Sequence, residues 1–119
     1  MVTESNRETN IYIPDRGDIV YLNFDPNKGH EQRGKRPAFT VSPAGYNSRT
    51  SLALFMPITS QQKGYPFEVI LPEIMKISGV ILTDQIKSLD WQARNAEFVE
   101  KASQNLIEEV QAKIEPLIF

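Results

Sequence analysis

The chain has 119 residues and a mass of 13.5 kDa, which fits one domain with one hydrophobic core. No apolar run reaches the ~18 residues that a membrane span requires, and the net charge of -2 argues against bulk electrostatic coating of nucleic acid. Cysteine is absent, which excludes disulfides, thiolate zinc sites and thiol nucleophiles, and a lone His30 excludes a two-histidine acid/base pair.

Residues 1–10 are polar and lack the basic start and apolar block of a signal peptide. We therefore expect a frayed or disordered lead-in, a single domain over residues 11–119, and a cytoplasmic protein. Short β-rich runs follow, separated by turns that contain glycine and proline. In chain order, strands are predicted at residues 19–24, 37–41, 51–58, 65–71, 80–85 and 86–91.

The segment at residues 42–50 predicts a turn or a short helical turn, and Pro57 suggests that the third strand meets an edge or a bulge. Five or six short strands in this arrangement indicate a small barrel or sandwich. The period then changes, because apolar residues recur at helical spacing from Leu106 to Leu117. With Ser103 as the N-cap, this pattern predicts one closing amphipathic helix.

A long polar loop between Phe24 and Pro37 separates the first two strands. From Lys28 to Arg36 it has four cations and one carboxylate, whereas residues 97–119 have five acids and two lysines. A polyanion is therefore attracted to the loop and repelled by the C-terminal end. Because the residue before a proline favours extended geometry, Arg36 should lie at the start of the strand at 37–41. A solvated surface loop is the simpler reading of such a composition.

The chain lacks both glycine-rich phosphate-binding motifs in a proper context. The pairs Asp15/Asp18 and Asp84/Asp90 are better explained by turns and strand ends than by two-metal chemistry, so no metal or other cofactor is required. Trp91 is read as a core aromatic, since only its residue type supports RNA stacking.

Seven local patterns occur in one order along the chain. They are RGDIV at 16–20, FDP at 24–26, GHEQ at 29–32, RPA at 36–38, PITS at 57–60, GYPFEV at 64–69 and TDQIKS at 83–88. This series closely resembles the MazF/PemK family of toxin endoribonucleases, over residues 11–119. The resemblance implies a mainly β fold, an SH3-like β-barrel with a C-terminal helix. It also implies a homodimer, metal-independent and sequence-specific cleavage of single-stranded RNA, a MazE-like antitoxin, and DNA binding by the antitoxin complex.

The matched positions imply that Arg36 and Thr59 are the catalytic pair, with Glu31 on the adjacent loop. The candidates for RNA binding are Lys28, Gln32, Arg33, Lys35, Ser60, Gln61, Lys63, Asp84, Gln85 and Lys87. In other branches of the family a catalytic arginine stands two positions before the Asp-Gln pair. Leu82 occupies that position here, so a scheme built on that arginine does not transfer.

These residues suit attack by the ribose 2′-hydroxyl, which builds negative charge on the phosphorus. A fixed guanidinium and a hydroxyl donor can stabilise this charge without a metal, and Glu31 is a candidate base. Two other readings stay open at this point: a non-catalytic toxin of the same fold that binds a protein target such as DNA gyrase, and a plain SH3-like binding module.

Overall fold

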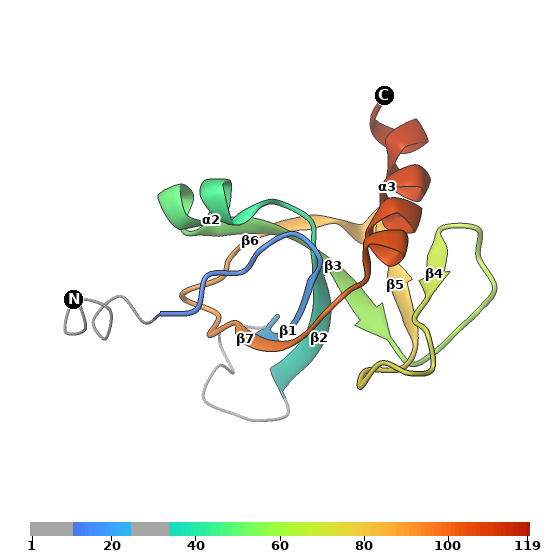
Figure 1. Ribbon diagram of the computed structural model, residues 1–119, viewed down its shortest axis with the longest axis horizontal. Coiled ribbons are helices and arrows are strands. Elements are labelled where there is room, and N and C mark those ends of the chain that lie inside the picture. Colours follow the sequence, from blue (N-terminus) through green and yellow to red (C-terminus); the bar gives the residue numbers. More distant parts are fainter. Residues whose placement is uncertain (1–10, 25–33) are drawn as a thin grey trace.

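The computed structural model describes residues 11–24 and 34–119, which form one curved sheet and two helices (Figure 1). The predicted lead-in and most of the basic loop, residues 25–33, lie outside this part. The elements are β1 (Asp18–Asn23), β2 (Lys35–Thr40), α2 (Ala44–Thr50), β3 (Leu52–Thr59), β4 (Glu68–Ile70), β5 (Val80–Leu82), the 3-10 turn η3 (Thr83–Gln85), β6 (Lys87–Asp90), β7 (Glu97–Lys101) and α3 (Gln104–Ile118).

The seven strands follow the order β4-β5-β3-β2-β1-β7, and β6 also pairs with β3. All the pairings are antiparallel. In the described part of the chain β4 and β7 end the path and do not pair with each other, so the fold is mainly β with a C-terminal helix and the barrel closure is not confirmed. Figure 1 shows α3 (red) projecting from the sheet near β5, well apart from α2.

Six of the seven strands overlap the runs predicted from the sequence. The exceptions are β7, which was not predicted, and the end of the fifth run, where residues 83–85 form η3 instead of strand. Pro57 does not lie on an edge strand, because β3 is flanked on both sides. On one side its partner changes from β6, paired up to Phe55, to β5, paired from Ile58. Pro57 lies between the two, where the missing N–H group interrupts no ladder on that side.

Neighbouring residues on the central strands enter two different apolar clusters, because successive side chains of a strand point to opposite faces. The first cluster lies under α3 and includes Ile19, Phe39 and Met56. The second cluster surrounds Trp91 and includes Val20. Both faces of the sheet are therefore buried, which explains why β1 and β3 read as almost continuous apolar runs.

The closing helix begins where the sequence predicted. The side chain of Ser103 accepts a hydrogen bond from the Leu106 N–H at 3.1 Å, and Leu106, Val110 and Ile114 are buried. Trp91 is a core residue, 5% exposed, and its indole N–H donates to the Asn47 carbonyl at 2.9 Å. The helices in the described residues are all too short or too polar to cross a membrane.

Candidate functional site

The strand register brings the two predicted catalytic residues to the same end of two adjacent central strands, β2 and β3. Arg36 pairs with Leu22 on one side of β2, and on the other side Ala38 pairs with Pro57 of β3. Continuing this antiparallel register by two residues places Arg36 opposite Thr59, the last residue of β3. Arg36 is exposed and Thr59 is half-buried, so both can be reached from solvent.

A hollow of about 540 Å³ lies over these two strand ends. It is lined by Tyr21, Arg36, Pro37, Pro57, Ile58, Thr59, Ser60, Gln61, Lys76, Ile77 and Ser78. Its volume is within the ~300–1,000 Å³ typical of ligand sites. The hollow is therefore larger than one phosphate group. We refer to it below as the Arg36 hollow.

A second hollow of about 240 Å³ adjoins the first, because Thr59 and Gln61 line both. Its other lining residues are Lys63, Tyr65, Phe67, Glu68, Leu82, Asp84 and Gln85. Aromatic and aliphatic side chains stand here beside amide and carboxylate groups. This combination is suited to a nucleobase, which presents a flat apolar face and a polar edge.

The loop that links the two hollows is held by hydrogen bonds from both of its ends. The Thr59 hydroxyl oxygen accepts from the Gln61 N–H at 3.2 Å, which leaves the hydroxyl hydrogen free to be donated elsewhere. The Glu68 carboxylate accepts from the N–H groups of Lys63 and Gly64 at 2.9–3.2 Å. The position of Lys63 is therefore set by the strand that follows the loop.

Part of the lining of the Arg36 hollow, Lys76 to Ser78, comes from the segment between β4 and β5, which the sequence pattern presented only as a linker. Gly79 has a φ of +124°, and a Cβ atom there would lie 2.2 Å from the Thr59 carbonyl oxygen. Only glycine fits so close to the end of β3. In addition, the Glu100 carboxylate of β7 accepts from the N–H groups of Lys76 and Ile77 at 3.0 and 2.9 Å.

Not every predicted RNA-binding residue lies at the hollows. The Lys35 ammonium is 2.6 Å from the Glu97 carboxylate, and the Lys87 ammonium lies 6.0 Å from the centre of the Phe24 ring. Neither residue lines either hollow. The predicted loop residues Lys28, Glu31, Gln32 and Arg33 lie outside the described residues.

The described residues include no group of three or more acidic or histidine side chains arranged to hold a metal ion. The sequence assigned Asp15 and Asp18 to a turn, and they do form a turn. The Asp18 carboxylate accepts from the Asp15 N–H at 3.0 Å, and the Asp18 N–H donates to the Asp15 carbonyl at 2.9 Å. The Lys101 ammonium lies 3.1 Å from the Asp18 carboxylate and 3.5 Å from that of Asp15.

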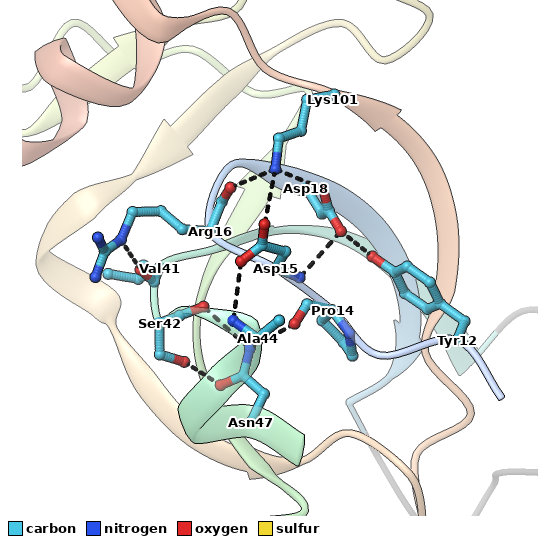
Figure 2. Close-up of polar contacts among 10 residues, drawn as sticks. All are labelled: Tyr12, Pro14, Asp15, Arg16, Asp18, Val41, Ser42, Ala44, Asn47 and Lys101. Carbon is cyan, nitrogen blue, oxygen red and sulfur yellow. Dashed lines mark hydrogen bonds and ion pairs between the residues drawn. The ribbon is translucent and has the colours of Figure 1, made fainter. Parts of the chain in front are cut away.

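Figure 2 shows how this network joins the N-terminal segment to β7 and α2. The Tyr12 hydroxyl donates to Asp18, and burial together with this bond raises the pKa of the Tyr12 phenol. A hydrogen bond from the Ala44 N–H lowers the pKa of Asp15, and the Lys101 charge acts in the same direction. The network fixes the start of β1 and is not part of either hollow.

Residues 15–118 match the family model described as "PemK-like, MazF-like toxin of type II toxin-antitoxin system". The chain belongs to this toxin family. The toxin is 46% identical over 107 residues to the "Endoribonuclease toxin MazF" of Escherichia coli strain K12, an alignment that covers 90% of this chain and 96% of the relative.

Two solved structures from Deinococcus radiodurans are also similar to this toxin. A MazE-MazF crystal structure has 44% identity and a TM-score of 0.82, and it covers 91% of this chain and 97% of the other. A crystal structure of MazF has 49% identity and a TM-score of 0.81, with 91% and 98% covered. Both place the mainly β architecture with its C-terminal helix in the MazF fold.

Proposed function

We propose that this toxin is an endoribonuclease that cuts single-stranded RNA, above all mRNA, at a short specific sequence without a metal ion. The observation that carries the proposal is that Arg36 and Thr59, the two residues implied to be catalytic, line one hollow at adjacent strand ends. The 46%-identical relative named as an endoribonuclease supports it. An mRNA substrate places the protein in the cytoplasm.

In this proposal Arg36 holds the scissile phosphate with its guanidinium, whose N–H groups match two phosphate oxygens at once. The free hydroxyl hydrogen of Thr59 is donated to a non-bridging oxygen, which becomes more negative in the transition state. The 2′-oxygen attacks the phosphorus while the bond to the 5′-oxygen breaks, and the leaving 5′-oxygen takes up a proton from a water molecule that Arg36 orients. The products are a 2′,3′-cyclic phosphate and a 5′-hydroxyl. Glu31 is the proposed base that removes the 2′-hydroxyl proton.

The second hollow is the proposed site for reading a base, with Gln61, Asp84 and Gln85 at the base edge and Lys63 near the backbone. The finer fold is proposed here as an SH3-like barrel, since β3 pairs with three strands, β2, β5 and β6, and the sheet is curved (Figure 1). A second copy of the chain completes the proposed homodimer.

The proposed partner is an acidic, extended antitoxin of the MazE kind, and the similar Deinococcus structure titled MazE-MazF supports this choice. Its acidic segment binds the cations of the basic loop and of β2, namely Lys28, Arg33, Lys35 and Arg36. Replacing these four residues by glutamine should speed the dissociation of the complex and weaken its dependence on salt. Unchanged dissociation rates in surface plasmon resonance would count against this contact.

The enzymatic proposal is tested by incubating a long unstructured RNA with the toxin in EDTA. Thr59→Val keeps the shape of the side chain and removes the hydroxyl, so the rate should fall on the order of 100- to 1,000-fold, with a similar or larger loss for Arg36→Ala. Thr59→Ser keeps the hydroxyl and should retain most activity. Arg49→Ala is the matched control, because Arg49 is also exposed but lies on α2 and lines neither hollow. Full activity of Arg36→Ala would refute the assignment.

A further inference from the structure

The wall of the Arg36 hollow contains a cation that the sequence motifs did not indicate. Lys76 lies between β4 and β5 and lines the hollow together with Arg36 and Thr59. It is exposed. Two cations from separate segments therefore border one hollow, which is the arrangement expected where a phosphate chain passes between them.

The Lys76 ammonium has no carboxylate or carbonyl partner among the residues that the structure describes, whereas three other lysines are engaged. Lys35 is paired with Glu97, Lys101 with Asp15 and Asp18, and Lys113 donates to the Pro66 carbonyl at 2.8 Å. The positive charge of Lys76 is thus available to a ligand in the hollow. A lysine acts as a point charge, and phosphate groups are among its usual ligands.

The backbone of Lys76 is held in place by hydrogen bonds to a side chain of β7, a strand distant in the sequence. Both oxygens of the Glu100 carboxylate are used, one by the Lys76 N–H and the other by the Ile77 N–H. Glu100 lies on β7, where it pairs with Ile19 of β1. The hydrogen bonds bridge 24 and 23 residues of sequence, so they fix the loop to the sheet and not merely to itself.

We infer that Lys76 is a further RNA-binding residue, which holds a backbone phosphate next to the scissile one, and that Glu100 is its positioning residue. The inference rests on the proposed function, in which Arg36 and Thr59 already bind the scissile phosphate. The volume of about 540 Å³ leaves room for a neighbouring nucleotide unit in the same hollow. Contact with a non-reacting phosphate is equally strong before and during the reaction, so it affects KM and not kcat.

The test compares Lys76→Gln, Lys76→Arg and Glu100→Gln with the wild type. Cleavage kinetics on a defined RNA give KM and kcat, and anisotropy with the same RNA, 2′-deoxy at the cut position, gives binding as a function of salt. Lys76→Gln should raise KM roughly tenfold and leave kcat within about twofold of the wild-type value. It should also lower, by about 0.7, the steepness with which the logarithm of the binding constant falls with the logarithm of the salt concentration, called the salt slope. Lys76→Arg should restore KM. Arg49→Gln, which removes one exposed charge on α2, should leave KM, kcat and the slope unchanged.

The positioning role is tested by a double-mutant cycle. Glu100→Gln keeps one acceptor oxygen and should raise KM about threefold, while the double variant with Lys76→Gln should bind no more weakly than Lys76→Gln alone. Additive losses would overturn the role of Glu100. A fall in kcat without a change in KM, or an unchanged salt slope, would overturn that of Lys76. A wild-type protein that cleaves no RNA in EDTA would refute the proposed function itself.

Discussion

Gly79 gives a direct test of how the loop between β4 and β5 supports Thr59. In Gly79→Ala the new Cβ would lie 2.2 Å from the Thr59 carbonyl oxygen, so the two must separate by about 1.2 Å to reach an ordinary contact of 3.4 Å. A displacement of about 1 Å at a reacting group costs roughly 100-fold in rate. The strained φ adds about 1–2 kcal/mol and the overlap about 1–3 kcal/mol, so we expect a total loss of about 2–5 kcal/mol in stability.

Urea unfolding and RNA cleavage in EDTA measure the two effects separately. Gly64→Ala is the stability control, because Gly64 has a φ of +81° and nothing within 4 Å of its added Cβ. It should lose only the strain of about 1–2 kcal/mol. Gly45→Ala on α2 meets nothing and has no such strain, so it should keep full activity. Equal stabilities for the Gly79 and Gly64 variants, or unreduced cleavage by folded Gly79→Ala, would refute the reasoning.

Three predictions concern the scaffold. Ser103→Ala removes the N-cap of α3 and should lower the free energy of unfolding by about 1 kcal/mol in urea titrations. Trp91→Phe removes the indole donor from the Asn47 carbonyl, which keeps its hydrogen bond from the Ser51 N–H, and leaves a void, so a loss of about 1–3 kcal/mol is expected. The pKa of Asp15 is lowered mainly by the hydrogen bond from the Ala44 N–H. The ionised Asp15 therefore stabilises the fold at pH values above its ordinary pKa of 3.8, and this contribution is lost as the pH falls below that value. The stability gap between wild type and Asp15→Asn should therefore narrow in acid.

A Ser103→Thr variant should behave as the wild type, and equal stability of Ser103→Ala would show that the cap contributes nothing. Trp91→Phe with unchanged stability would contradict the core role of the indole. For Asp15, a stability gap that is the same at pH 7 and pH 3 would contradict the pKa argument.

Strands with an apolar pattern were predictable. Both faces of β1 and β3 are buried, and their sequences are therefore almost continuous apolar runs. In contrast, β7 was missed because its five residues include Glu97, Glu100 and Lys101 and it is stabilised by pairing with β1. Such charged residues are usual on an edge strand and hide its pattern. The 3-10 turn η3 was predicted as the end of a strand for a related reason. Three polar residues after a strand do not indicate whether their backbone hydrogen bonds continue the strand or form a 3-10 turn.

The motif residues of the candidate site were named from the sequence, and the structure places Arg36 and Thr59 at one hollow and Asp84 at the adjoining one. Their chemical roles stay predictions. The contribution of Lys76 could not be predicted, because it depends on hydrogen bonds to Glu100, 24 residues away, and on the close approach of Gly79 to Thr59. Neither contact has a local sequence signal.

Metal-independent cleavage by the 2′-hydroxyl is tested most directly by the ends of the cut RNA. A long unstructured RNA is incubated with the toxin in EDTA, the cuts are mapped by primer extension, and the fragments are labelled by polynucleotide kinase with and without prior phosphatase. We expect cuts at one recurring short sequence, with 5′-hydroxyl ends that label without phosphatase and 2′,3′-cyclic phosphates on the other side. Intact RNA, or fragments with 5′-phosphates, would contradict it.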